Sequence, residues 1–360
     1  MVGGCAGPVL IGAASTFLDF NLSASGLLPA GALFFEKHMQ RTLTPRGNQT
    51  NARVFRATAI ALLMALPAIA ATGAARGGGA ETDVQAAEAG ATIAPDRTLV
   101  YKTANGVELR LHVFNPAGHD VSHPRPCIVL FHGGAFTRGD PSQFYPQAKH
   151  LAERGMVAVS AQYRLNKERA QIDACIADAK SAIRWVRGHA AELGIDPAMI
   201  AAGGGSAGGH LATATAILEG FDDPSDDLTV SCIPNALILF NAVIDMSPDG
   251  YGYDRAVALM GDEWARISPA QHLEKGLPPT LFLVGSEDRL IKPKVAKRIE
   301  AAAKAAGSRF ELKVYEGAKH GFFNFGRNDE KDYYALTVAA MDEFLASLGY
   351  LEASATVTRQ

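Results

Sequence analysis

The chain has 360 residues, enough for one large domain or two small ones, and 48% of them are hydrophobic, an ordinary share for a globular protein. Its 34 basic and 37 acidic side chains leave a formal net charge of −3. Because neither a basic run nor a long acidic tail occurs, the composition argues against nucleic acid as a partner and favours a small molecule or a neutral polymer.

Residues 1–75 predict a secretory signal. Arginines precede an almost wholly apolar run over residues 57–71, and small residues follow it, as in a leader that is cleaved. Since a leader stands at the start of a protein, we expect Met39 to be the true first residue. The apolar run is short for a membrane span and contains Pro67. These features favour cleavage over a transmembrane anchor, and they predict an exported protein, periplasmic or secreted, without stable membrane insertion.

The rest of the chain divides into three parts. Residues 76–94 are mostly Gly, Ala, Glu and Thr, which predicts a flexible linker. One folded domain is expected over residues 95–350, followed by a flexible tail at 351–360.

The predicted domain holds three cysteines, Cys127, Cys175 and Cys232. An odd number at irregular spacing is no disulfide framework, so we expect buried free thiols, with a Cys175–Cys232 pair as the alternative. Neither a Cys-x-x-Cys nor a His-Glu-x-x-His motif occurs in the sequence, and no metal site is therefore expected.

Strand and helix patterns alternate along the domain. Two segments of alternating polarity, 98–102 and 107–113, flank Asn105-Gly106, a strong hairpin turn signal. Continuous apolar runs, typical of strands buried on both faces, and segments of helical spacing follow. The strands are expected at 126–131, 155–161, 199–203, 236–240, 280–284 and 310–315, and the helices at 171–193, 209–218, 294–306 and 334–348.

This order predicts an α/β fold with a mostly parallel central sheet, helices on both faces and an antiparallel N-terminal hairpin. Residues 246–279, rich in Pro, Gly, Asp and Tyr, interrupt the alternation and predict a small lid. In such sheets, ligands bind at the carboxyl ends of the strands, so the candidate site is sought there.

The most specific motif is Gly204-Gly205-Ser206-Ala207-Gly208, which matches G-x-S-x-G between an apolar strand and a helix. A serine on such a strained turn presents its hydroxyl at the start of the helix, and glycines let the chain pack closely around it. The alternative is a glycine-rich turn that holds a phosphate. Partners elsewhere in the chain decide between the two.

Those partners follow later strands. Asp288 comes directly after the strand at 280–284, and His320 follows the strand at 310–315. The resulting order of Ser206, Asp288 and His320 is the one expected for a nucleophile, an acid and a base on this architecture. Asp245, after the preceding strand, competes with Asp288. His210 precedes the acid, and we expect it to face helix packing.

A further motif, His132-Gly133-Gly134, follows the strand at 126–131. Glycines there free backbone N–H groups to point at a developing oxyanion, and the Ala207 N–H supplies another donor. We therefore predict Gly133, Gly134 and Ala207 as an oxyanion hole.

With these motifs the chain resembles the α/β-hydrolase fold, and within it the serine esterases of the hormone-sensitive-lipase and acetyl esterase type. Tyr163-Arg164-Leu165 and Asp178-Ala179 also resemble that family, and the resemblance covers roughly residues 95–350. It implies carboxylesterase activity of this domain without a cofactor. Two departures, Gly205 in place of an acid before the serine and no evident large cap, look more like secreted acetyl esterases of polysaccharides.

The expected function is therefore an exported serine carboxylesterase that removes short acyl groups, above all acetyl, from carbohydrate or small alcohols. A lipase or serine peptidase of the same fold and a non-catalytic carbohydrate-binding protein are the alternatives. Aromatic residues near strand ends are candidates for the acyl pocket, with core packing as the alternative for each: Phe136, Phe144, Tyr145, Phe240, Tyr251, Tyr253 and Phe322.

Overall fold

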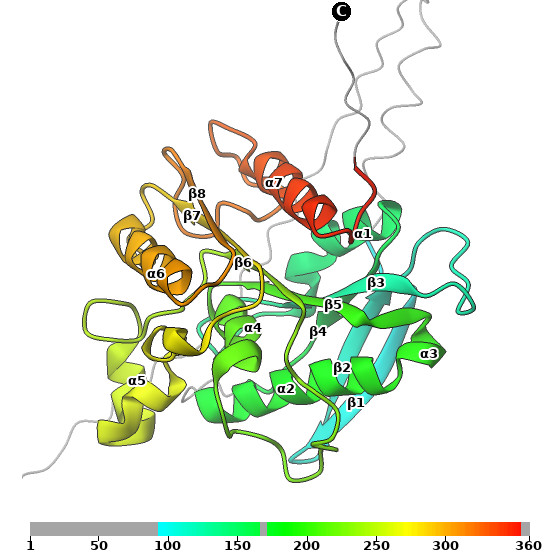
Figure 1. Cartoon of the computed structure of the whole chain (residues 1–360), viewed down its shortest axis with the longest axis horizontal. Coiled ribbons are helices and arrows are strands. Elements are labelled where there is room, and N and C mark those ends of the chain that lie inside the picture. The colour runs from blue at the N-terminus through cyan, green and yellow to red at the C-terminus, as the bar shows by residue number, and fades with distance from the viewer. Residues whose placement is uncertain (1–92, 166–170, 354–360) are drawn as a thin grey trace, which may run out of the picture. The chain divides into compact units, whose positions relative to one another are not determined.

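The computed structural model describes residues 93–165 and 171–353 (Figure 1). The predicted leader over residues 1–75, the linker up to residue 92 and residues 354–360 of the predicted tail lie outside the described residues. Met39, the expected first residue, lies outside them too, and the predictions made for these segments stay predictions.

A single eight-stranded sheet organises the described residues, in the order β1-β2-β4-β3-β5-β6-β7-β8. The strands from β3 onward pair in parallel, whereas β1 pairs with β2, and β2 with β4, in antiparallel fashion. The predicted α/β fold with an antiparallel N-terminal hairpin is confirmed. The strands are β1 (Arg97–Ala104), β2 (Val107–Phe114), β3 (Arg125–Phe131), β4 (Val157–Ala161), β5 (Ile195–Gly205), β6 (Ala236–Phe240), β7 (Thr280–Gly285) and β8 (Phe310–Tyr315).

Helices cover both faces of the sheet. Figure 1 shows α1 and α7 on one face and α2 and α4 on the other. The core divides accordingly, because Cys127 and Val129 of β3 belong to one apolar cluster and Ile128 and Leu130 to the second. Burial on both faces explains why the strands have continuous apolar runs. The helices are α1 (Tyr145–Glu153), α2 (Ile172–Gly188), α3 (Ala190–Leu193), α4 (Ala207–Ile217), α5 (Tyr253–Met260), α6 (Pro293–Ala305) and α7 (Tyr333–Ser347).

Local signals set several boundaries. Asn105 and Gly106 both have positive φ, 52° and 77°, as the tight turn between β1 and β2 requires. The helix predicted over residues 171–193 is two helices, because the backbone leaves helical geometry at His189 between α2 and α3. Gly194, with φ of 60° and ψ of 41°, ends α3 in the left-handed conformation that glycine favours.

The segment predicted as a lid forms α5 and three short 3₁₀ turns, η2 (Gly261–Ile267), η3 (Pro269–Gln271) and η4 (Leu273–Lys275). Of these, η3 packs against α4 and η4 against α6, so the segment is a folded insertion between β6 and β7. That it covers a bound substrate stays a prediction.

Other features refine the predicted domain. Cys127, Cys175 and Cys232 are buried free thiols, so the alternative Cys175–Cys232 pair is not formed. Tyr350 and Leu351 are buried and pack in the core, and Leu351 is the first residue of the stretch 351–360 for which a flexible tail stays the prediction. No helix among the described residues is long and apolar enough to cross a membrane.

Candidate active site

The turn that carries Ser206 joins β5 directly to α4. Ser206 has φ of 52° and ψ of −113°, a backbone conformation that residues other than glycine rarely adopt. Its N–H donates to the Phe240 carbonyl at 2.9 Å, and its hydroxyl does not cap the helix. A Cβ on Gly208 would lie 1.9 Å from the Phe131 carbonyl oxygen, so glycine is required for α4 to approach β3. This strained turn leaves the Ser206 hydroxyl available to a neighbouring group.

That group is His320, on the loop after β8. His320 Nε2 lies 3.0 Å from Ser206 Oγ, and its Nδ1 lies 2.8 Å from Asp288 Oδ2. Asp288 is buried, and its other oxygen accepts the N–H groups of Leu290 and Ile291 at 2.9 Å each. With Nδ1–H donating to the carboxylate, Nε2 is left to accept the serine O–H. The structure thus joins the three predicted residues in one hydrogen-bonded chain.

The competing residues lie elsewhere. Asp245 is buried beside Arg298, with which it forms an ion pair, and its Oδ1 accepts the Ser247 N–H at 2.8 Å. His210 is fully buried in α4, and its Nδ1 is 2.9 Å from the Val243 carbonyl. Desolvation lowers the pKa of His210 to about 4, so this imidazole is neutral near pH 7.

The loop after β3, residues 132–139, is called the glycine loop here. Its Gly133 N–H donates to Gln143 Oε1 at 2.6 Å, so in this structure it already has an acceptor, and its use as an oxyanion donor stays a prediction. A Cβ on Gly133 would lie 3.1 Å from the Gly205 carbonyl oxygen, and close approach accounts for this glycine. The Gly134 N–H has no hydrogen-bond partner among residues 93–165 and 171–353. Ala207 begins α4, where an N–H has no acceptor within the helix.

The site therefore combines a serine, a buried carboxylate and an imidazole between them with two unpaired backbone N–H groups on neighbouring elements. A family model described as BD-FAE matches residues 111–302. The chain belongs to the BD-FAE family. Its relatives and structural neighbours are serine esterases of the α/β-hydrolase fold.

Two relatives illustrate the BD-FAE match. The apo form of Thermogutta terrifontis esterase 2 is 43% identical, with a TM-score of 0.69 over 73% of this chain and 98% of that chain. The probable carboxylic ester hydrolase LipM of Mycobacterium tuberculosis is 30% identical over 194 residues, which is 49% of this chain and 44% of LipM. The chain spans about half the length of the curated relatives that it matches.

Phe323 explains the glycine before the serine in this BD-FAE member. A Cβ on Gly205 would lie 2.3 Å from Cζ of Phe323, whose ring is buried against Phe144 and Phe240. No motif predicts this contact, although Phe322-Phe323 directly follows His320-Gly321 in the sequence. The aromatic ring thus occupies the space that a side chain at position 205 would need.

Most of the aromatic residues considered for the acyl pocket belong to the core. Phe144, Phe240 and Phe322 are fully buried, and Phe136 is buried with its ring edge-to-face on His210. A pocket of about 430 Å³ opens instead beside His132 of the glycine loop. Its polar lining includes Asp140, Gln162, Tyr163 and Arg164.

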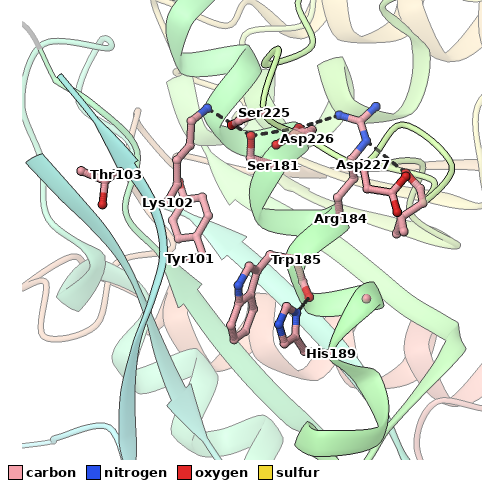
Figure 2. A pocket seen from close by; sticks show the side chains of 12 residues that line it. Tyr101, Lys102, Thr103, Ser181, Arg184, Trp185, His189, Ser225, Asp226 and Asp227 are labelled. Carbon is pink, nitrogen blue, oxygen red and sulfur yellow. Dashed lines mark hydrogen bonds and ion pairs between the residues drawn. The ribbon is translucent and has the colours of Figure 1, made fainter. Parts of the chain in front are cut away.

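A second pocket, of about 360 Å³, lies between β1 and α2 (Figure 2). Its charged groups already have partners: Lys102 bonds to Ser181 at 3.1 Å, and Arg184 Nη1 bonds to Asp226 at 2.9 Å. Within the described residues, no group of three or more His, Cys, Asp or Glu side chains is arranged to hold a metal ion.

Proposed function

We propose that this protein is an exported serine carboxylesterase that hydrolyses short-chain acyl esters, above all acetyl esters, of carbohydrate or small alcohols. The hydrogen-bonded chain from Ser206 through His320 to Asp288 is the observation that carries the chemistry. Export rests on the predicted leader, and the short acyl group rests on the structures of a related esterase with short acids bound.

Each group has a defined role in the reaction. His320 takes the proton from Ser206 as its oxygen attacks the ester carbonyl, and then gives that proton to the leaving alcohol. Asp288 holds the imidazole in the required tautomer and stabilises the imidazolium. The N–H groups of Gly134 and Ala207 are the donors for the oxyanion, and one such donor contributes about 3 kcal/mol. Water then hydrolyses the acyl-enzyme with His320 as base.

Short acyl groups are supported by the relatives. Thermogutta terrifontis esterase 2 is described with propionate bound and with butyrate bound, and this chain is 44% and 42% identical to those structures. The same esterase is described as phosphorylated by paraoxon, a reaction that requires an activated nucleophile. We infer that Ser206 reacts with small acyl and phosphoryl groups in the same way.

The direct test is Ser206→Ala with p-nitrophenyl acetate as substrate. Because removal of the nucleophile leaves only binding and oxyanion stabilisation, we expect kcat to fall by at least about 10³-fold. The circular dichroism spectrum and melting temperature of the variant should match the wild type. Full activity in that variant would end the proposal.

Substrate comparisons separate the remaining possibilities. A series of p-nitrophenyl esters from acetate to octanoate, with acetylated xylan alongside, should give the highest kcat/KM for acetate; a maximum at octanoate would favour a lipase. Faster cleavage of amides than of esters would favour a peptidase. A fluorophosphonate probe should label Ser206, whereas a non-catalytic carbohydrate-binding protein would not react.

A further inference from the structure

Side-chain hydrogen bonds connect the glycine loop with the loop after β8, residues 316–324, called the histidine loop here. Gln143 Oε1 accepts the Gly133 N–H at 2.6 Å, and Gln143 Nε2 donates to Asn324 Oδ1 at 3.0 Å. Asn324 Nδ2 in turn donates to the Gly321 carbonyl at 2.8 Å. The path runs from the loop beside Ser206 to the residue next to His320.

A third loop joins the same path. The Gly321 N–H donates to Oδ1 of Asn241 at 3.1 Å, and Asn241 is the first residue after β6. Asn241 is fully buried, has a positive φ of 37°, and donates its own N–H to the Leu283 carbonyl at 2.7 Å. Both backbone polar groups of Gly321 are therefore held by amide side chains.

An aromatic cluster adjoins this hydrogen-bonded path. Each amide residue has a phenylalanine as its neighbour in the sequence, in the pairs Gln143-Phe144, Phe240-Asn241 and Phe323-Asn324. The three rings are buried and pack together, with centroids 5.6, 5.4 and 4.9 Å apart. Gly205 makes room for the Phe323 ring at the centre of the site.

We propose that Gln143, Asn324 and Asn241 are positioning residues that clamp the glycine loop and the histidine loop to one another, so that the oxyanion donor and His320 keep one geometry about Ser206. The proposal rests on the proposed function, because it concerns the same site. None of the three residues needs to touch the substrate. Their effect passes through Gly133 and through Gly321.

A primary amide side chain has both the acceptor and the donor that this hydrogen-bonded path requires. A primary amide both accepts and donates, so Gln143 and Asn324 relay a bond in one direction from Gly133 to Gly321. An ionised carboxylate only accepts and would break the relay at its second bond. Misplacing reacting groups by about 1 Å costs about 100-fold in rate, so a clamp between base and oxyanion donor matters most in the transition state.

The test uses the full chain and the variants Gln143→Leu, Asn324→Leu and the double variant. We expect each single variant to lower kcat for p-nitrophenyl acetate by about 10- to 100-fold, with KM within about twofold of the wild type. The double variant should be no slower than the worse single variant, because one broken link already releases the relay. Gln143→Glu, which keeps the acceptor for Gly133 but not the donor, should lose kcat as well and serves if the leucine variant does not fold.

A second readout does not need catalysis. Amide hydrogen exchange over residues 319–325 should quicken in Gln143→Leu, although Gln143 does not touch Gly321. The matched control is Asn235→Leu. The Asn235 side chain accepts the Ile200 N–H at 3.2 Å, and Asn235 lies just before β6, at the ends of the strands opposite to the site. It should leave both kcat and this exchange unchanged.

Three results would overturn the clamp: kcat within twofold in Gln143→Leu, losses that multiply in the double variant, or unchanged exchange over residues 319–325. An altered KM with unchanged kcat would also overturn it, since that pattern indicates substrate contact. If the wild type hydrolyses no ester, the proposed function fails instead, and the exchange measurement alone decides the clamp.

Discussion

Gly205 shows how one missing side chain shapes the candidate site. Replacing it with alanine places a Cβ 2.3 Å from Cζ of Phe323, and the ring is held between Phe144 and Phe240. We therefore expect Gly205→Ala to lower the free energy of unfolding by about 1–3 kcal/mol, as overpacked cores do, and to lower kcat because Phe323 belongs to the histidine loop. Urea unfolding and p-nitrophenyl acetate kinetics measure both effects.

Two variants check this explanation. Gly188→Ala is the control, because a Cβ there meets nothing within 4 Å, and its unfolding free energy should stay within about 1 kcal/mol of the wild type or rise. The double variant Gly205→Ala/Phe323→Leu, in which a smaller side chain replaces the Phe323 ring, should recover part of the lost stability. If the double variant is less stable than Gly205→Ala alone, contact with Phe323 is not the cause.

His210 predicts a pH dependence of stability. Desolvation lowers the pKa of this buried imidazole to about 4, whereas an unfolded histidine has a pKa of about 6.5. Between these values the unfolded chain binds more protons, so stability is full above about pH 6.5 and falls as pH drops toward 4, by up to about 3 kcal/mol. His210→Gln should flatten the pH profile of the unfolding free energy in this window.

The matching control is His123→Gln, since the His123 side chain is 78% exposed. Its unfolding free energy at pH 7 should stay within about 1 kcal/mol of the wild type, as for other exposed pairs. An unchanged slope in His210→Gln would show that other groups govern acid unfolding.

At the scale of elements, Asp178 ties α2 to β1 and to the segment after β4. It is fully buried and accepts Arg164 Nε at 2.7 Å, Arg164 Nη2 at 2.6 Å and Lys102 Nζ at 2.9 Å. Figure 2 shows Lys102 reaching from β1 toward Ser181 of α2. Asp178→Asn removes the buried carboxylate and leaves Lys102 and Arg164 only Asp223 as a counter-charge, so we expect it to cost about 3 kcal/mol in urea unfolding, the lower end for a broken buried pair.

An exposed ion pair provides the contrast. Arg309 and Glu311 are 43% and 42% exposed, and Glu311→Gln should cost less than about 1 kcal/mol. A loss of similar size in both variants would mean that burial does not determine the contribution of Asp178.

The elements also show what the sequence could predict. Strands such as β3 and β7 were predictable because burial on both faces requires a continuous apolar run. Helix α1 was not predicted, since it is only nine residues long and its buried face holds Gln147 and two alanines with one large apolar side chain, Leu151. The break at His189 is likewise invisible in a hydrophobic pattern that continues through α2 and α3.

At the site, too, only the residues placed by the strand order could be predicted. Ser206, Asp288 and His320 were predictable because each lies on the turn or loop that follows a strand, and parallel strands bring their carboxyl ends to one edge. Gln143 and Asn324 were not, because their hydrogen bond joins residues 181 positions apart and neither lies in a motif. The acceptor of the Gly133 N–H could not be predicted for the same reason, since the Gln143 side chain lies in no motif.

At the scale of the whole molecule, the two faces of the sheet have separate apolar clusters, and only one of them includes the C-terminal helix. The apolar cluster that includes α7 also includes residues after this helix. Tyr350 and Leu351 are 7% and 6% exposed and pack in that cluster. The last residue of the predicted domain and the first residue of the predicted tail are therefore both packed in the core. A sequence pattern could not show this, since two apolar residues before a polar stretch have no period.

Leu351 provides the last prediction. Leu351→Ala removes buried methyl groups from a packed cluster, and we expect it to lower the unfolding free energy by about 2–3 kcal/mol. Glu352→Ala is the control, because that residue is exposed and only its backbone carbonyl bonds to Arg154. Thermal and urea unfolding of both variants, with kcat measured at 25 °C, separate stability from catalysis. Leu351 and the rings beside Gly205 belong to the same cluster. Leu351 is not part of the hydrogen-bonded chain of Ser206, His320 and Asp288, so Leu351→Ala should keep kcat while the variant is folded, and a loss of kcat without a loss of stability would contradict this.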